Sequence, residues 1–484
     1  MKTKILIGLI FLFLFPLFSF AQDQTQWPTF QGNNARTGFS DSKGPSKPDI
    51  LWQLTAGDFR RLNIDPRGIN RPIIYKNKVF FASGAAIAVE LHTGKILWHS
   101  NLDPTNLFPV RIIAGEEKIF VVANNSTLIK TMTEGYVYAL NEASGQLLWK
   151  YQTQKSISHS IPVFADGKVF VGDDSGTLYA IEAKSGELVW KKFLDAEQIH
   201  SSPAYDNGIV FVGTEGTAIS NKLPSHIFAL NAQTGSVIWK FQVDYLPDKV
   251  NLVHATPAIL DGIVYVGCEN GYFYALRAND GHLIWKKKTT ASGERVVGAS
   301  APAALAYGKI FVRLWEGKMQ VLSQKDGEIL WERIFGRGSE DFSPIVADGK
   351  IYIGHHSFYS LNAENGKIVW EQKFPGRVPA LADGILVVPN ADVADGSPDY
   401  TSVLIAYSES ETQPQSPQSQ PQPRSQSQPQ SQSQETPSIR ESAKESKEPQ
   451  EIVKKEFKEG TEVVHKNIFQ KIREAIINFF KRIF

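Results

Sequence analysis

Three histidines occupy equivalent positions in a repeated part of this 484-residue chain. His159, His200 and His254 each stand three residues before a proline that opens a strand-like segment. Imidazoles are common metal ligands, and protonated imidazoles attract anions. We favour the interpretation that these rings hydrogen-bond between repeat units, with no metal assigned. The alternative is that they capture a small ligand or a metal ion, as in a sensor.

Other polar residues fall near the same positions of the repeat. The next two equivalent slots hold Ala299 and Asp341. Four arginines lie near the starts of strand-like segments: Arg71, Arg111, Arg295 and Arg377. The three histidines, Asp341 and these arginines therefore form our candidate binding site. We assign no catalytic residue, because HExxH, CxxC, GxSxG and phosphate-loop patterns do not occur in the context that they require.

The elements that must position these residues are two hairpins in each repeat. The phrase GxxxW recurs after a strand-like segment, as in GQLLWKYQT from Gly145. A second hairpin signal precedes it, as in PVFADGKVFVG (162–172), where Asp-Gly supplies the positive φ of a tight turn. Acidic residues in such turns are interpreted as structural: Asp166, Asp261, Asp348 and Asp383. Each repeat thus predicts four antiparallel strands, a propeller blade whose first strand lines a central channel.

The number of repeats indicates how the ring closes. Eight segments carry the opening signal of a blade, whereas seven carry the complete GxxxW phrase. DILWQLTA (49–56) lacks preceding strands, and the last repeat, 379–407, lacks its final strand. The sequence therefore predicts an all-β, eight-bladed β-propeller of four-stranded antiparallel blades over residues 22–408, closed by an N-terminal outer strand. We expect its outer-strand tryptophans to dock each blade against the next: Trp52, Trp98, Trp149, Trp190, Trp239, Trp285, Trp331 and Trp370.

Insertions indicate which end of the channel binds a ligand. Blades two, four and eight lengthen the loop between their second and third strands, at 124–135, 215–226 and 390–400. That loop shares an end of the blade with the entry to the first strand, where the histidines stand. We expect specific binding at this end.

The repeat, together with WPTFQGNNARTGFS (27–40), resembles the pyrroloquinoline-quinone-like propeller repeats over residues 27–408. In this family, quinoprotein dehydrogenases hold the quinone and calcium against an adjacent Cys-Cys disulfide, which Cys268 alone cannot form. Outer-membrane β-barrel assembly lipoproteins of the family are scaffolds without a cofactor. With the disulfide excluded, the resemblance implies an exported, non-catalytic binding or scaffold propeller at the cell envelope, in outer-membrane protein assembly and without cofactor. The alternative is a quinone-dependent oxidoreductase with an altered site, which would use pyrroloquinoline quinone and calcium.

The N-terminal residues indicate export. Lys2 and Lys4 precede an apolar run that ends near Ser19 and Ala21, which is typical of a signal peptide over residues 1–21. We therefore expect a monomeric propeller in the periplasm or at the cell surface. Lys plus Arg number 51 and Asp plus Glu number 50, so no overall charge attracts nucleic acid.

The C-terminal residues predict a tether and a helix. Residues 409–450 are rich in Gln, Ser and Pro, which is typical of a disordered linker. Residues 451–484 predict a basic amphipathic helix with an apolar face: Ile468, Phe469, Ile472, Ile476, Phe479, Phe480 and Ile483. Such a helix could lie on an anionic membrane surface, bind an envelope protein or pack on its own propeller, and we favour the membrane.

Overall fold

The computed structural model describes residues 26–409, apart from 65–68, 70, 83–84, 101, 103–106, 126–133, 218–222, 248–249, 290–297, 315–316, 336–342 and 391–402. The chain divides into two compact units, Met1–Gln413 and Pro414–Phe484, and the described residues all belong to the first. The predicted signal peptide, the linker beyond residue 409 and the C-terminal helix with its apolar face lie outside the described residues. No helix within the described ranges is long and apolar enough to cross a membrane.

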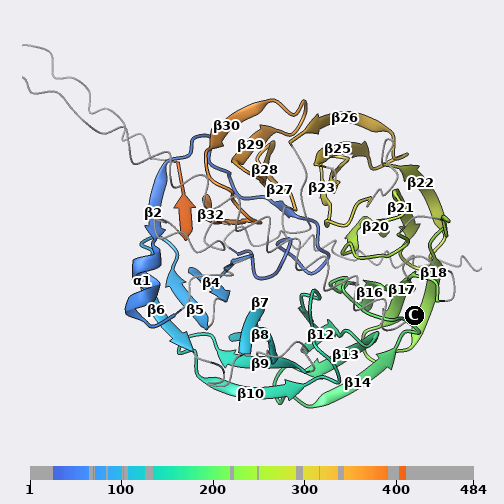
Figure 1. Ribbon diagram of the computed structural model, residues 1–484, viewed down its shortest axis with the longest axis horizontal. Helices are drawn as coiled ribbons and strands as arrows, with labels where there is room; N and C mark the ends of the chain where they lie inside the picture. The colour runs from blue at the N-terminus through green and yellow to red at the C-terminus, as the bar shows by residue number, and fades with distance from the viewer. Residues whose placement is uncertain are drawn as a thin grey trace, which may run out of the picture. The chain divides into compact units, whose positions relative to one another are not determined.

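The strands of the first unit form eight sheets arranged around a ring (Figure 1). Blade one contains β3 (Ile73–Tyr75), β4 (Lys78–Ala82), β5 (Ala86–Glu90) and β6 (Ile96–Ser100). Blade two contains β7 (Leu107–Gly115), β8 (Lys118–Asn125), β9 (Gly135–Asn141) and β10 (Leu147–Gln152). Blade three contains β11 (Val163–Ala165), β12 (Lys168–Gly172), β13 (Thr177–Glu182) and β14 (Leu188–Phe193). Blade four contains β15 (Ala204–Asp206), β16 (Ile209–Gly213), β17 (His226–Asn231) and β18 (Val237–Gln242).

The second half of the ring repeats this order. Blade five contains β19 (Ala258–Leu260), β20 (Ile263–Gly267), β21 (Tyr272–Arg277) and β22 (Leu283–Lys288). Blade six contains β23 (Ala304–Ala306), β24 (Lys309–Arg313), β25 (Lys318–Ser323) and β26 (Ile329–Ile334). Blade seven contains β1 (Phe39–Ser40), β27 (Ile345–Ala347), β28 (Lys350–Gly354), β29 (Phe358–Asn362) and β30 (Ile368–Gln372). Blade eight contains β31 (Ala380–Ala382), β32 (Ile385–Pro389), β33 (Leu404–Tyr407) and β2 (Ile50–Leu54), and the short helix α1 (Ala56–Arg61) follows β2.

The predicted fold class and the closure of the ring are confirmed. In blade eight, β2 pairs antiparallel with β33, with Trp52 opposite Ala406. The N-terminus therefore supplies the outer strand and the C-terminal repeat supplies the other three. The predicted Asp-Gly hairpin turns are also present: Asp166 has a φ of 49° and Gly167 a φ of 69°, as a two-residue turn between twisted strands requires.

The outer-strand tryptophans lie at the junctions between blades. The indole N–H of Trp98 in blade one donates to the carbonyl of Glu142 in blade two, at 3.1 Å. Its ring also packs on Gly145, where a Cβ would come within 2.5 Å of the ring. Equivalent indole hydrogen bonds reach the next blade from Trp52, Trp149, Trp190, Trp239 and Trp285. Trp370 donates to the carbonyl of Pro45 instead, and the indole N–H of Trp331 has no partner among the described residues, although its ring packs on Gly366.

The segment from Trp27 to Ser40 crosses the centre of the ring, which the repeat analysis did not predict (Figure 1). Trp27 pairs with Ile74 in blade one, and β1 pairs parallel with β27 in blade seven. Between these ends, inner-strand N–H groups donate to successive carbonyls of the segment at 2.7–2.8 Å: Ala114 to Pro28, Tyr205 to Asn34, Ile259 to Ala35 and Leu305 to Thr37. The segment therefore covers inner strand edges that would otherwise be open to the channel.

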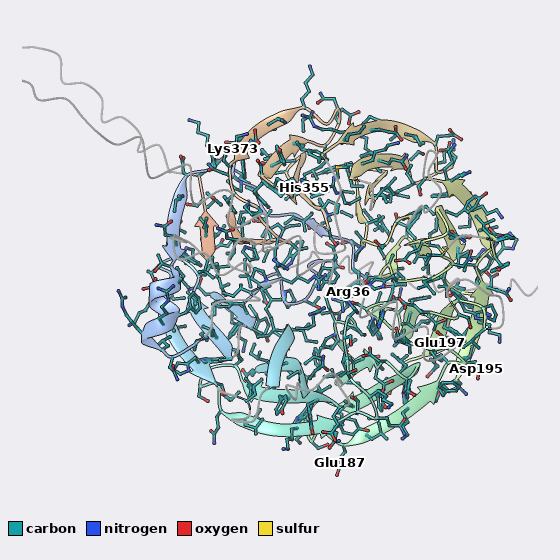
Figure 2. All side chains as sticks on the ribbon, viewed as in Figure 1. Arg36, Glu187, Asp195, Glu197, His355 and Lys373 are labelled. Carbon is teal, nitrogen blue, oxygen red and sulfur yellow. The ribbon has the colours of Figure 1, made fainter. Side chains whose placement is uncertain are left out.

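Arg36 fixes this segment at the centre of the ring, where Figure 2 labels it. Its guanidinium is fully buried and donates to the carbonyls of Ile161 and Pro162, at 3.2 and 2.7 Å, and of Pro203, at 3.0 Å. Two further hydrogen bonds go to Phe30 O and Thr29 Oγ1 within the segment. Burial lowers the pKa of Arg36 to about 9. One side chain thus joins the N-terminal segment to blades three and four.

Candidate ligand site at the channel mouth

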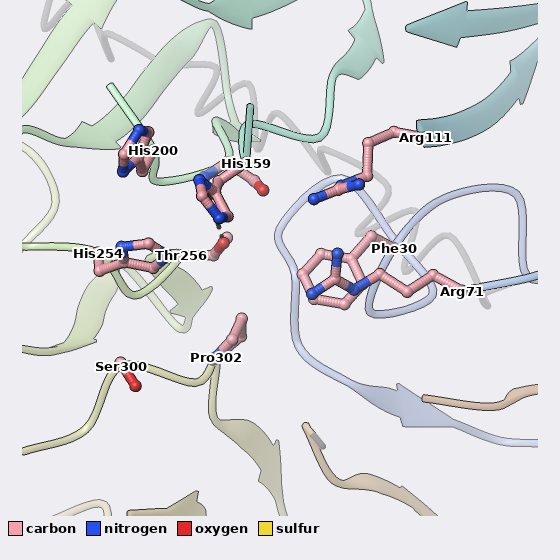
Figure 3. Close-up of a pocket in the computed structure, with 10 residues that line it drawn as sticks. Phe30, Arg71, Arg111, His159, His200, His254, Thr256, Ser300 and Pro302 are labelled. Atoms are coloured by element: carbon pink, nitrogen blue, oxygen red, sulfur yellow. Dashed lines mark hydrogen bonds between the residues drawn. The ribbon is translucent and has the colours of Figure 1, made fainter. Parts of the chain in front are cut away.

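The structure brings the three equivalent histidines together (Figure 3). They lie on the segments that enter β11, β15 and β19, the innermost strands of three consecutive blades. The ring centroid of His159 lies 4.4 Å from that of His200 and 5.1 Å from that of His254. The ring centroids of His200 and His254 are 5.3 Å apart. Each ring offers one nitrogen, and these three nitrogens all lie within 4.8 Å of one another.

Glu215 contacts the Nδ1 atoms of two of these rings. Its Oε2 lies 3.1 Å from Nδ1 of His200, and its Oε1 lies 2.8 Å from Nδ1 of His254. Glu215 opens the insertion 215–226 of blade four, so that loop shares an end of the blade with the histidines. The insertion was predicted from the sequence, but Glu215 was not among the predicted site residues. Glu215 is the first residue of a lengthened loop that was expected beside the histidines. That position could have identified it from the sequence.

Asp174 is the second carboxylate of the site and was also missed. It lies in the turn between β12 and β13, and its Oδ1 is 3.5 Å from Nε2 of His200. The hydroxyls of Ser156 and Ser158 donate to Asp174, as does the backbone N–H of Ser158 at 3.2 Å. His200 therefore bridges carboxylates from blades three and four. Such a contact is consistent with histidines that hydrogen-bond between repeat units.

The charges of the cluster follow from these contacts. Burial lowers the pKa of His200, but hydrogen bonds to Asp174 and Glu215 outweigh burial and raise it to about 9. Burial raises the pKa of Glu215, yet hydrogen bonds from His200 and His254 hold it at about 2. Burial lowers the pKa of His159 to about 3, helped by the neighbouring His200, His254 and Arg111. Without a ligand, the cluster therefore pairs an imidazolium at His200 with a carboxylate at Glu215 and keeps His159 neutral.

The opposite wall of the pocket carries positive charge (Figure 3). The guanidinium of Arg71 lies 4.9 Å above the ring centroid of Phe30, and Arg111 donates to the carbonyl of Ser158 at 3.2 Å. The remaining lining residues are small: Ser202, Thr256, Ser300 and Pro302. The cavity is about 20 Å³. Because about 10–15 Å³ is needed to hold one water molecule, the pocket has room for an ion or a small group.

Within the described part of the chain, the remaining predicted site residue does not join this pocket. Arg377 is described but does not line it, and its backbone N–H donates to the carbonyl of Pro389 at 2.9 Å. Ala299 is fully buried. Arg295 and Asp341 lie outside the described residues, so their candidate roles stay predictions.

The described residues of this pocket do not fit pyrroloquinoline quinone with calcium. Where one water molecule needs about 10–15 Å³, the cavity of about 20 Å³ has room for one small group and not for a tricyclic quinone. Calcium takes six to eight oxygen ligands, whereas imidazole nitrogens converge here. Cys268, the single cysteine of the chain, is fully buried and its Sγ donates to Leu252 O at 3.3 Å, so no disulfide platform exists. Burial also raises the pKa of the Cys268 thiol, which makes it unreactive.

Comparison with known proteins identifies the relatives of the chain. A family model described as outer membrane protein assembly factor BamB matches residues 133–355 and 315–415. BamB of Yersinia pestis is 25% identical over 208 residues, which are 42% of this chain and 52% of that protein. The chain thus matches about half the length of this curated relative.

Solved structures share the propeller. A europium-containing methanol dehydrogenase has a TM-score of 0.63 at 15% identity, covering 80% of this chain and 99% of its own. BamB of Moraxella catarrhalis has a TM-score of 0.55 at 17% identity, covering 76% of this chain and 99% of its own. A quinohemoprotein alcohol dehydrogenase of Comamonas testosteroni has a TM-score of 0.61 at 14% identity, covering 79% of this chain and 80% of its own. Because scaffold proteins and enzymes share this fold, the structural similarity does not distinguish a scaffold from a dehydrogenase.

Proposed function

The chain belongs to the pyrroloquinoline-quinone-like propeller family whose model is described as outer membrane protein assembly factor BamB, and from this we propose that it is a non-catalytic scaffold in outer-membrane protein assembly. The observation that carries the proposal is the family match, which spans 133–355 and 315–415 and so more than half of the 484 residues. The poor fit of the pocket to a quinone supports the same choice. We place the protein in the periplasm, on the signal peptide expected over residues 1–21.

The outer strands offer a surface for such a scaffold. A register shift just before each tryptophan places two consecutive apolar side chains toward solvent, as at Leu147 and Leu148, which are 46% and 47% exposed. The pattern repeats around the ring at Ile50 and Leu51, Leu188 and Val189, Val237 and Ile238, Ile329 and Leu330, and Ile368 and Val369. We call these pairs the apolar rim. Repeated exposed apolar groups favour protein contact, and we assign the rim to an envelope assembly protein.

Photo-crosslinking in the living cell tests this assignment. A photoreactive amino acid replaces Leu148, Val189 or Ile238 in the full chain, and the exposed Lys76, in the turn between β3 and β4, serves as the control. Rim positions should crosslink to an identified outer-membrane or envelope assembly protein, and the Lys76 position should not. Failure of every rim position to give such a product would refute the rim as the contact surface.

The C-terminal residues are proposed to hold the scaffold near its membrane. The basic amphipathic helix expected over residues 451–484 would bind anionic lipid headgroups, on the linker of residues 409–450. The full chain should co-sediment with vesicles that contain anionic lipid but not with neutral vesicles. Co-sedimentation that persists after deletion of residues 451–484 would contradict this role.

The oxidoreductase alternative has a direct test. The solved methanol and alcohol dehydrogenases share the propeller, but at 14–15% identity that likeness concerns the fold alone. Calorimetric titration of the full chain with pyrroloquinoline quinone and calcium should give no heat of specific binding. Tight binding with dye-linked oxidation of an alcohol or a sugar would replace the scaffold proposal with an enzyme.

A further inference from the structure

We propose that His159, His200 and His254 bind one divalent transition-metal ion of the zinc type at the channel mouth. This inference goes beyond the scaffold role and does not depend on it. Imidazole nitrogen is a preferred donor for zinc, copper and nickel, whereas calcium and magnesium prefer oxygen. Three side chains from three consecutive blades present such nitrogens within 4.8 Å of one another.

The surroundings of the rings have the features of a second coordination shell. Glu215 contacts Nδ1 of both His200 and His254, at 3.1 and 2.8 Å. A carboxylate behind a ligating imidazole fixes the orientation of the ring and raises its basicity. Glu215 is itself only 6% exposed, so this support is built into the fold rather than formed at the surface. We therefore assign the Nε2 atoms of these two rings as ligands, and at His200 the ion would replace the 3.5 Å contact of Nε2 with Oδ1 of Asp174.

His159 supplies an independent reason for a ligand. Its Nδ1 is buried and makes no hydrogen bond within the described part of the chain. A buried polar nitrogen without a partner costs free energy, and coordination of this ring would offset that cost.

The pocket also fits an ion by size and charge. Zinc–nitrogen bonds of about 2.0–2.1 Å place tetrahedral ligands roughly 3.4 Å apart, so binding would draw the three rings together by about an ångström. The cavity of about 20 Å³ allows this movement. Glu215 and Asp174 compensate the charge of the ion, and Glu215 disfavours a bare anion at the histidines. Arg71 and Arg111 face the remaining open side, where they would hold an anionic metal ligand such as a carboxylate or phosphate.

The test is a titration of the full metal-free chain with zinc chloride by calorimetry, and with cobalt chloride by visible absorption. We expect one ion per chain and the intense absorption of four-coordinate cobalt. His159→Ala and His254→Ala should weaken zinc binding by more than about 100-fold, and Glu215→Gln by about 10–100-fold, the range typical of second-shell residues. His92→Ala is the matched control, because His92 is 49% exposed and contacts only the exposed Asp383 among the ion pairs of the described residues.

A second measurement separates loss of binding from loss of folding. Zinc should raise the unfolding temperature of the unchanged chain, since a ligand that binds the folded state stabilises it. His159→Gln, which keeps a polar side chain of similar size but removes the imidazole, should fold and lose this shift. The proposal is overturned if His159→Gln keeps the shift, if His92→Ala weakens binding as much as His159→Ala does, or if the metal-free chain binds inorganic phosphate through the histidines and takes up no zinc.

Discussion

Arg36 carries a charge at the centre of the propeller, where the described residues offer it no carboxylate. Its five hydrogen bonds go to carbonyl and hydroxyl oxygens of the N-terminal segment and of blades three and four. The planar guanidinium reaches all of them at once, which the single ammonium of lysine cannot do. The segment is thus held by one residue whose geometry matters as much as its charge.

Replacement of Arg36 by methionine should therefore destabilise the protein strongly. The substitution removes the guanidinium donor from the buried carbonyls of Ile161, Pro162 and Pro203, and we expect a loss of roughly 3–5 kcal/mol, as for other broken buried polar networks. Denaturant unfolding followed by tryptophan fluorescence measures it. Arg60→Met, at an exposed position of α1, is the control and should change the stability by less than about 0.5 kcal/mol. Similar losses in both variants would contradict the role of Arg36.

His200 makes stability depend on pH in a defined window. Its pKa rises from 6.5 in the unfolded chain to about 9 in the folded protein, where Asp174 and Glu215 bind it and His159 and His254 face it. The folded state holds this proton more tightly, so the stabilisation is complete below pH 6.5 and is lost as the pH rises through 9. Unfolding curves of metal-free protein should show a stability difference from His200→Gln that shrinks across this range. A difference that stays constant from pH 6 to 10 would refute the assignment.

The sequence predicted the histidines of the site but not their carboxylate partners. Equivalent slots in repeats of one fold must share a position in space, so His159, His200 and His254 could be grouped from spacing alone. Glu215 and Asp174 depend on the path of individual loops, which the repeat does not determine. Arg36 was missed because its segment lies outside the repeat and its partners are backbone carbonyls, which have no sequence signal.

At the scale of elements, each GxxxW glycine supports the tryptophan of the preceding blade. Gly235 has a φ of 70°, and a Cβ there would lie 2.6 Å from the ring of Trp190. Gly262 has a φ of 71° in a tight turn, but a Cβ there would meet nothing within 4 Å. The two positions therefore separate the cost of backbone strain from the cost of displacing the indole.

Substitution of both glycines measures this difference. Gly262→Ala should cost about 1 kcal/mol through the positive φ alone. Gly235→Ala should cost about 1–3 kcal/mol more, because the methyl group also overpacks the junction between blades three and four. Urea unfolding of the two variants gives the comparison. Equal losses would show that the glycine is required only for its φ.

The hairpins were predictable wherever the turn consists of Asp-Gly or Asn-Gly, as at Asp166 and Asn207. The same positive φ also occurs without glycine, at Lys76 and Asn77 (48° and 61°) and at Glu116 and Glu117 (48° and 61°). At Lys76, Glu116 and Glu117 the strand pairing on both sides imposes a conformation that local propensity does not favour. The segment from Trp27 to Ser40 has no hydrophobic period at all, so only the assembled ring defines its path.

At the scale of the whole molecule, the two ends of the propeller sequence meet in one blade. Trp52 on β2 donates to the carbonyl of Leu91 in blade one at 2.7 Å and packs on Gly94. This contact joins blade eight to blade one and so closes the ring. Such closure removes the exposed edges that an open array of blades would have.

Trp52→Ala should therefore destabilise the entire propeller rather than one blade. We expect a loss of about 3–5 kcal/mol, typical of removing a buried tryptophan, and an earlier thermal transition seen equally by fluorescence and circular dichroism. Ile50→Ala on the same strand, at a side chain that is 57% exposed, should shift the transition little. A transition in which only part of the signal moves would contradict closure as a property of the whole ring.

The scaffold role is tested most directly by the abundance of β-barrel proteins in the outer membrane after deletion of the gene for this chain in its own organism. Folded barrel proteins should decrease after the deletion, and the full chain should restore them. A chain with charged residues in place of Leu148, Val189 and Ile238 should restore them less well. Unchanged levels of barrel proteins after deletion would contradict the proposed role in outer-membrane protein assembly.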